Sequence, residues 1–360
     1  MPLPRPTGVV TVNTHPPFPD ADLHGTTLRD LGLTIAGTPL EPILAEFGRE
    51  LEAVGLAGLD PEYYLSTEWG VPFPSTAIAI PFYLARPDLT ALHAARTGLI
   101  EGDGRADTLR YLRHEMGHVI NYAYLLYEQE EWTERFGAFT RPYPEEYAPR
   151  PFSQEYVRHL PGWYAQKHPD EDWAETFAVW MAPGRDWRAE YAGWPTALAK
   201  LEYCDRVVRA VAGTPSRLNM DAAGGADDEE EGDLLDLSLG DLYEGDEEAV
   251  VELPGLDGAL RTLFEDAGHA PASGDVPAGR LIRSLEREVA TNVFRWTGHF
   301  PERTLPLLKQ IARRADDLGQ VTHPGRESAA AVGLTALVTA LAMNYVYRGA
   351  YFPGGGQEEG

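Results

Sequence analysis

The most chemically distinctive residues of this sequence are His114, Glu115 and His118, which stand in the pattern His-Glu-Met-Gly-His. On a helix, residues four apart lie on one face, so both imidazoles can bind the same metal ion. A carboxylate next to the first histidine can take a proton from the water that such an ion activates. The pattern therefore predicts a hydrolytic zinc site with two histidine ligands and Glu115 as general base.

A catalytic zinc needs a third protein ligand and an open fourth position. Metzincins extend the motif with a glycine and a third histidine, but this chain has Asn121 and Tyr124 at those places. An upstream cysteine ligand is also excluded, because Cys204 is the only cysteine and lies downstream. The remaining option is a carboxylate from a downstream helix, and the segment 168–175 (HPDEDWAE) is the strongest candidate.

These two motifs together resemble the gluzincins, most closely the lethal-factor-type enzymes and the family of putative zinc-binding metallopeptidases, whose second helix carries Glu-x-x-Ala-Glu. The resemblance implies that Glu171 is the third ligand. It also implies that Glu175 holds a ligand histidine through its other ring nitrogen. Tyr164, seven residues before Glu171, matches a tyrosine that lethal-factor-type enzymes place beside the zinc, and this match implies a phenol that stabilises the oxyanion. The resemblance covers about residues 100–182.

The third ligand is not fixed by these residues alone. Asp170 and Asp172 flank Glu171, and either one could compete for the metal. Acidic residues in a first helical turn also stabilise the helix N-terminus without any metal. Lone histidines are more often surface or capping groups than ligands, and four fall in this class: His159, His168, His299 and His323.

Apolar periodicity predicts the helices that position the motifs. Helical spacing runs from residue 41 to 54, and a long helix is expected from Asp107, as its N-cap, to about residue 127. The second motif helix is expected over 170–181, between a proline and a Pro-Gly stop. The segment 136–161 between them is expected to be irregular.

One strand is predicted near the site. The apolar segment 77–84 has proline-containing boundaries, and Pro81 within it is typical of an edge strand because proline cannot donate to an inner ladder. An edge strand here would let an extended peptide substrate pair with the sheet.

The whole chain is expected to belong to the α+β class. With the resemblance, this means a zincin-like domain over 1–220, with a small mixed sheet, an active-site helix and a second ligand helix. Thirteen acidic residues and no lysine or arginine lie between Asp221 and Glu248, so 221–250 is expected to be a solvated linker or loop. Helical patterns then predict a mainly helical C-terminal domain over 251–360, within 260–264, 281–294, 305–318 and 328–347.

The apolar stretch 329–347 is long enough for a membrane span, but it is rich in alanine and threonine and is expected to be a buried helix. The formal net charge of −26 argues against binding to nucleic acid or an anionic membrane. No secretory signal is legible at the N-terminus, so the expected location is the cytoplasm.

Zinc-dependent hydrolysis of a peptide or protein substrate is the leading interpretation. A catalytically silent metal-binding interaction protein is one alternative, although a structural site needs no general base. A zinc hydrolase acting on a non-peptide amide is another, because it would use the same motifs.

Overall fold

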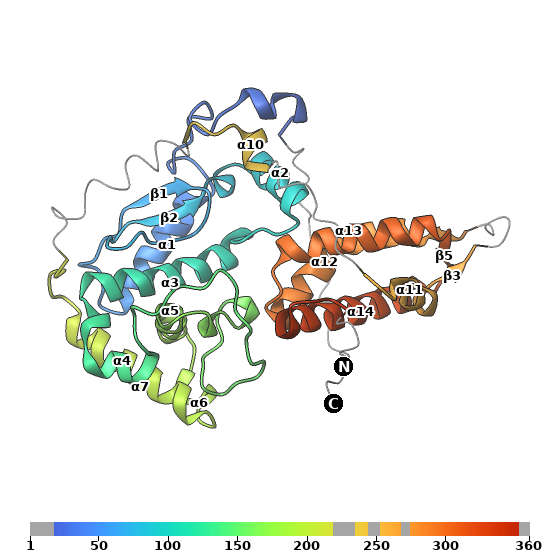
Figure 1. The fold of residues 1–360 in the computed structure, drawn as a ribbon. Coiled ribbons are helices and arrows are strands. Elements are labelled where there is room, and N and C mark those ends of the chain that lie inside the picture. Colours follow the sequence, from blue (N-terminus) through green and yellow to red (C-terminus); the bar gives the residue numbers. More distant parts are fainter. Residues whose placement is uncertain (1–17, 219–234, 244–252, 268–273, 353–360) are drawn as a thin grey trace, which may run out of the picture.

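The computed structural model describes residues 18–218, 235–243, 253–267 and 274–352, and Figure 1 shows their arrangement. In these residues the fold is mostly helical with two small sheets, which is compatible with the predicted α+β class. The elements in chain order are η1 (Asp20–Gly25), α1 (Leu40–Ala53), β1 (Tyr63–Ser66), β2 (Ile78–Pro81), η2 (Phe82–Ala85), α2 (Pro87–Thr97), α3 (Gly104–Ala123), η3 (Leu126–Glu128), α4 (Glu130–Phe136), η4 (Pro161–Gln166), α5 (Pro169–Met181), α6 (Trp187–Glu190), α7 (Pro195–Val211), α10 (Leu239–Tyr243), α11 (Leu256–Leu263), β3 (Glu265–Asp266), β4 (Val276–Pro277), α12 (Ala278–Thr297), α13 (Pro301–Asp317), β5 (Gln320–Thr322) and α14 (Glu327–Arg348).

Both helices predicted to carry the motifs are present, as α3 and α5. α5 begins one residue earlier than predicted and ends at the predicted residue. α3 begins at Gly104, and the predicted N-cap Asp107 lies inside the helix, where its carboxylate accepts a hydrogen bond from the Gly102 amide at 3.0 Å. α3 also ends at Ala123 rather than near residue 127. The segment between α4 and η4 is irregular, as predicted.

The glycine of the histidine motif allows α3 and α5 to approach closely. A Cβ atom on Gly117 would lie 2.6 Å from the Cα of Ala174 on α5, which is too close for any side chain. The indole Nε1 of Trp173 donates a hydrogen bond to the Gly117 carbonyl oxygen at 2.7 Å. Gly117 is therefore explained by helix packing.

The predicted strand is shorter than expected and is one of the two strands of its sheet. β2 pairs in parallel with β1, and the Ile78 amide donates to the Glu62 carbonyl oxygen at 2.7 Å. The next amide, of Ala79, points to the other side and donates to the Gly70 carbonyl oxygen at 2.8 Å. This isolated bridge covers one position on the second side of β2, which is an edge strand of a two-stranded sheet as predicted, and substrate pairing along β2 stays a prediction. Pro81 is tolerated because it is the last residue of the strand, where no further ladder bond is needed.

Part of the predicted acidic linker is packed against the N-terminal region. The Leu239 amide donates to the Thr26 carbonyl oxygen at 2.9 Å, and Leu239 is fully buried. The apolar residues between the acidic ones explain this attachment of 235–243, whereas the rest of 221–250 lies outside the described residues. The proposed boundaries at 220 and 250 also fall outside them and stay predictions.

Four helices form the C-terminal region, as predicted: α11, α12, α13 and α14. They enclose a hydrophobic core of their own, separate from the core that surrounds α3 and α5. β5 pairs antiparallel with both β3 and β4, and strands this short leave no periodic pattern in a sequence. In Figure 1 these helices project to one side of the α3–α5 region.

The apolar helix predicted at 329–347 is α14, and it is covered on one face only. Leu334, Val338 and Leu341 are buried, whereas Val332 is 71% exposed. Among the described residues, α14 is the one helix with the length and composition to cross a membrane. The prediction of a buried helix thus holds for one face.

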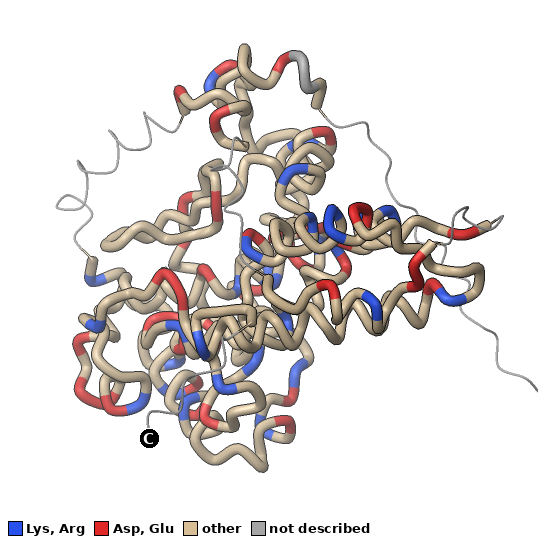
Figure 2. Tube along the Cα trace, turned by 45° about the vertical axis from the view of Figure 1, so that its right-hand side comes forward, with Lys and Arg blue, Asp and Glu red and all other residues tan. Residues whose placement is uncertain are grey.

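The two cores meet where α12 packs against η4. The indole Nε1 of Trp163 donates to the carbonyl oxygen of Trp296 at 3.1 Å. Gly162, with a φ of +78°, lies under the ring of Phe294, where a Cβ would come within 2.6 Å of a ring carbon. Because η4 leads into α5, the C-terminal helices contact the turn that precedes the second motif. Charged residues of both signs are spread along the described parts of the chain (Figure 2).

Candidate metal centre and active site

α3 and α5 bring the two predicted histidine ligands together with the predicted carboxylate. The Nε2 atom of His114 lies 3.0 Å from Oε2 of Glu171 and 3.3 Å from Nε2 of His118. The Nε2 atom of His118 lies 3.4 Å from the same carboxylate oxygen. All three side chains are buried, and their donor atoms lie within 4.8 Å of one another. Two imidazole nitrogens and one carboxylate oxygen are a donor set that fits a hydrolytic zinc site.

Each histidine is held by another carboxylate through its second ring nitrogen. The Nδ1 atom of His114 lies 3.0 Å from Oε1 of Glu175, and the Nδ1 atom of His118 lies 2.9 Å from Oδ2 of Asp170. Such partners fix the orientation and tautomer of a ligand histidine. Glu175 therefore lies where its predicted role requires. Asp170 lies in the equivalent position for the other histidine, at its Nδ1 atom rather than at the two Nε2 atoms.

Two residues of α3 that sequence reasoning missed hold Asp170 in place. The side-chain amide of Asn121 donates to Asp170 at 2.7 Å, and the hydroxyl of Tyr122 donates to it at 2.5 Å. Tyr122 stands four residues after His118, which is one helical turn, and this spacing is the signal by which it could have been found.

Asp172 points away from the histidines. Its carboxylate lies 2.6 Å from Nζ of Lys200 on α7, and both side chains are buried. Burial raises the pKa of Asp172 to about 7 against the opposing effect of Lys200. Of the three consecutive acidic residues, Glu171 alone faces both histidine Nε2 atoms.

The electrostatics of the cluster favour an anionic Glu171. Burial by itself raises its pKa, but the charge of His118 and the hydrogen bonds with both histidines outweigh burial and hold the pKa well below its usual value. Burial by itself lowers the pKa of His114, but hydrogen bonds to Glu171 and Glu175 raise it to about 10. A metal ion bound at the Nε2 atoms of the two histidines would replace the protons there, so metal binding and protonation of these histidines compete.

Two tyrosine hydroxyls lie next to the cluster. Tyr143 donates to Oε1 of Glu171 at 2.5 Å, and its oxygen is 3.3 Å from the hydroxyl of Tyr164. The Tyr164 ring centroid is 5.6 Å from that of His114, so the predicted oxyanion residue is beside the histidines. Nζ of Lys167 lies 3.5 Å from the Tyr164 hydroxyl. Tyr143 belongs to an irregular loop, where neither a motif nor a period marks it.

Glu115, next to the first histidine of the cluster, is a buried carboxylate. The residue is 4% exposed, and its carboxylate has no hydrogen bond or ion pair with another residue in the described part of the chain. Burial raises its pKa. A carboxylate of this kind, next to a metal ligand, is suited to accept a proton from water.

The lone histidines stay outside the cluster, as expected. Nδ1 of His168 accepts the Asp170 amide hydrogen and caps α5. His159 is hydrogen-bonded to the Arg110 carbonyl oxygen at 2.8 Å, and burial lowers its pKa to about 4. The remaining two bind protein groups of the C-terminal region: His299 and His323.

Two cavities adjoin the cluster and share His114, Glu115 and Tyr164 in their walls. One has a volume of about 410 Å³ and is lined by aromatic residues that include Phe73 and Phe139. The other, of about 360 Å³, extends toward the C-terminal helices. Glu115 therefore forms part of the wall of both cavities.

Comparison with known families is consistent with this geometry. Residues 87–184 match the sequence model of a family described as "Putative zinc-binding metallo-peptidase". The match runs from α2 through α5 and so includes both histidines and the carboxylate of the cluster. No match to a curated protein or to a solved structure is found. This region is thus similar to zinc-binding metallopeptidases, and together with the His-His-Glu donor set it identifies zinc as the cofactor.

Proposed function

We propose that the protein is a zinc-dependent peptidase of gluzincin type, in which His114, His118 and Glu171 bind the metal. The observation that carries this proposal is the convergence of these three donors beside Glu115, a buried carboxylate without a partner in the described residues. The placement of α3 between a small sheet and α5 is the arrangement expected of a zincin-like domain.

Each residue beside the metal has a chemical role in this proposal. Zinc, when bound, supplies a Lewis acid that polarises a carbonyl group and lowers the pKa of a water molecule. Glu115 accepts the proton of the attacking water and delivers it to the leaving amine. Tyr164 donates a hydrogen bond to the oxygen that gains charge during the attack. Burial, followed by the charge of Glu171, raises the pKa of Tyr164 well above its usual value, so its hydroxyl stays a donor.

The backbone around Gly70, which bridges to Ala79 of β2, offers an edge that an extended peptide would use. Trp69, Gly70 and Val71 line the 410 Å³ cavity beside the histidines. Gly70 pairs with β2 on one side, and no second backbone partner of this stretch is found in the described ranges. Main-chain pairing along such an edge is a common mode of peptide binding.

Zinc content and peptide cleavage, measured on the same samples, test the proposal. Wild type is expected to hold one zinc per chain, Glu171→Gln to lose it on dialysis, and Glu145→Gln, an exposed control in the same part of the chain, to keep it. Glu115→Gln is expected to keep the zinc and to cleave a peptide library about 10² to 10⁴ times more slowly.

The alternatives give different results. A wild type that binds zinc and cleaves no peptide, but hydrolyses simple amides, would establish a non-peptide amide hydrolase. Zinc binding without hydrolysis of either kind of substrate would favour the catalytically silent metal-binding interaction protein. Absence of zinc from wild type, or its retention in Glu171→Gln, would contradict the proposed ligand set.

A further inference from the structure

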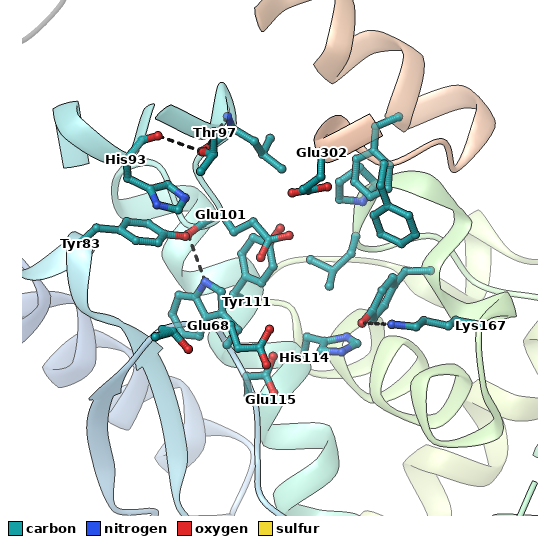
Figure 3. Close-up of a pocket in the computed structure, with 18 residues that line it drawn as sticks. Glu68, Tyr83, His93, Thr97, Glu101, Tyr111, His114, Glu115, Lys167 and Glu302 are labelled. Carbon is teal, nitrogen blue, oxygen red and sulfur yellow. Dashed lines mark hydrogen bonds between the residues drawn. The ribbon is translucent and has the colours of Figure 1, made fainter. Parts of the chain in front are cut away.

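The 360 Å³ cavity is built by both parts of the chain. Figure 3 shows Glu101 and Tyr111 entering from the segment around α3, and Glu302 entering from the C-terminal side. Glu302 is the second residue of α13, whereas Tyr111 is one turn before His114 on α3. A group bound in this cavity would thus contact the C-terminal helices and the reaction centre at once.

Carboxylates dominate the charge of this cavity. Glu68, Glu101, Glu115 and Glu302 line it, together with the cation Lys167 and with His114, whose charge is already paired with Glu171 and Glu175. The Lys167 ammonium lies 4.4 Å from the Tyr143 ring centroid and 3.5 Å from the Tyr164 hydroxyl, which places it at the tyrosine side of the cavity. No ion pair of Glu68, Glu101 or Glu302 with a lysine or arginine is found within the described ranges. The negative charge is therefore not balanced locally.

The spacing of these carboxylates fits an organic cation better than a metal ion. Among the described residues, the one group of His, Cys, Asp or Glu close enough to share an ion is His114, His118 and Glu171. The acidic residues of the cavity come from separate elements and do not form such a group. Carboxylates that are too far apart to coordinate one ion can still surround a longer charged group.

Aromatic rings supply the apolar part of the cavity. The rings of Trp69 and Tyr111 are stacked with centroids 5.4 Å apart, and Phe294 and Phe300 are stacked at 5.3 Å on the C-terminal side. Such surfaces pack against the aliphatic part of a long basic side chain, and they also attract a cation over the ring face.

We propose that this cavity is the subsite for a cationic group of the substrate, the ammonium or guanidinium group of a basic residue beside the scissile bond. The inference rests on the proposed peptidase function, whose reaction centre shares Glu115 and His114 with the cavity. Glu101 and Glu302 are the residues that select the charge, and the C-terminal helices therefore take part in choosing the substrate.

The electrostatic state of Glu101 agrees with this assignment. Burial, followed by the charge of Glu302, raises the pKa of Glu101 to about 7. Burial also raises the pKa of Glu302. A bound cation would offset the repulsion between these carboxylates and be stabilised by both.

The test compares N-acetylated hexapeptides that differ only in Lys or norleucine at each position flanking the cleaved bond. Norleucine keeps the aliphatic stem and removes the charge. The expected kcat/KM ratio of Lys to norleucine is roughly tenfold or more at one position. This ratio is expected to fall toward one in Glu302→Gln and Glu101→Gln and to persist in Glu288→Gln, an exposed α12 residue outside the cavity wall.

Binding separates this inference from the peptidase proposal. The same peptides are titrated calorimetrically into the Glu115→Gln protein and into its double variant with Glu302→Gln, after melting curves show that both are folded. Tighter binding of the Lys peptide, lost in the double variant, supports the cation subsite even if no peptide is cleaved, and that result would contradict only the peptidase. A free-amine norleucine peptide that gains the same advantage would identify the substrate N-terminus as the source of the charge. Equal binding and cleavage of all peptides would overturn the inference.

Discussion

Three consecutive acidic residues at the start of α5 have three different partners. Asp170 binds the Nδ1 atom of His118, Glu171 lies at both histidine Nε2 atoms, and Asp172 binds an ammonium group. Successive helical residues point about 100° apart, so neighbours in sequence face different surroundings. The motif match selected Glu171, but residue types alone left Asp172 open, because the lysine that binds it comes from α7.

Tyr164 is expected to act on the transition state more than on substrate binding. Tyr164→Phe removes the hydroxyl and keeps the ring beside His114. We predict a decrease in kcat of about 10² to 10³, as for loss of one oxyanion donor, with KM nearly unchanged. Steady-state kinetics on a cleaved peptide, at saturating zinc, measure the two constants.

Tyr143→Phe is the matched comparison, because the Tyr143 hydroxyl donates to Glu171 at 2.5 Å. Loss of such a partner is expected to weaken zinc binding by about 10- to 100-fold. Competition with a zinc chelator reports this affinity. If Tyr143→Phe lowered kcat and Tyr164→Phe weakened the metal, the two roles would have to be exchanged.

The contact between α3 and α5 sets the distance between the two motifs. Because Gly117 faces the Cα of Ala174, a larger residue has to separate the helices or distort them. The distance between the histidines and Glu171 therefore depends on a residue that binds no metal.

Gly117→Ala is predicted to destabilise the protein although alanine favours helices. A Cβ at 2.6 Å from backbone cannot be relieved by moving a side chain, and overpacking of this kind costs about 1 to 3 kcal/mol in the free energy of unfolding. The control is Gly48→Ala on α1, where a Cβ meets nothing within 4 Å and a gain of up to about 1 kcal/mol is expected. Urea denaturation of the three proteins measures both changes. A stabilised Gly117→Ala variant would show that α5 can move away.

The helices were predictable because each repeats apolar residues over several turns and is bounded by proline or glycine. This holds for α1, α5 and the long C-terminal helices, whose apolar spacing can be recognised without knowledge of their tertiary contacts. The bridge between β2 and Gly70 was not predictable, since the segment around Gly70 has no strand pattern. For the same reason, no sequence pattern indicated that the loop places Tyr143 next to Glu171.

At the scale of the whole molecule, two hydrophobic cores meet at the active-site cavity. α12 packs on η4, and Glu302 faces a cavity that also contains Glu115 (Figure 3). Apolar periodicity predicted a helical C-terminal region, but the contact with η4 joins residues more than a hundred positions apart, which periodicity cannot reveal.

Selection for a cationic substrate is predicted to depend on pH near neutrality. Glu101 has a pKa raised to about 7, so it is largely neutral below that pH and charged above it. The kcat/KM ratio of Lys to norleucine peptides should therefore rise with pH between about 6 and 8. Protein groups whose titration affects cleavage of both peptides equally do not change this ratio. The titratable and charged groups that line the cavity with Glu101 are Glu68, Tyr83, His93, Tyr111, His114, Glu115, Tyr164, Lys167 and Glu302. Burial lowers the pKa of His93 to about 4, so it stays neutral over this range.

The Glu101→Gln variant is the control for this pH profile. It should show a smaller ratio that no longer changes between pH 6 and 8. If wild type and Glu101→Gln had the same slope, another group would be responsible for the titration.

The cavity wall that comes from α13 lies outside the region similar to metallopeptidases, which ends at residue 184. In the proposed function, bond cleavage depends on residues of the matched region, whereas the choice of substrate also depends on Glu302, which lies outside it. In evolutionary terms, we expect residues of α13 that line the cavity to vary more readily than the three donors of the His-His-Glu cluster. We therefore expect proteins that share the two motif helices to differ in substrate preference according to the residue at positions such as Glu302.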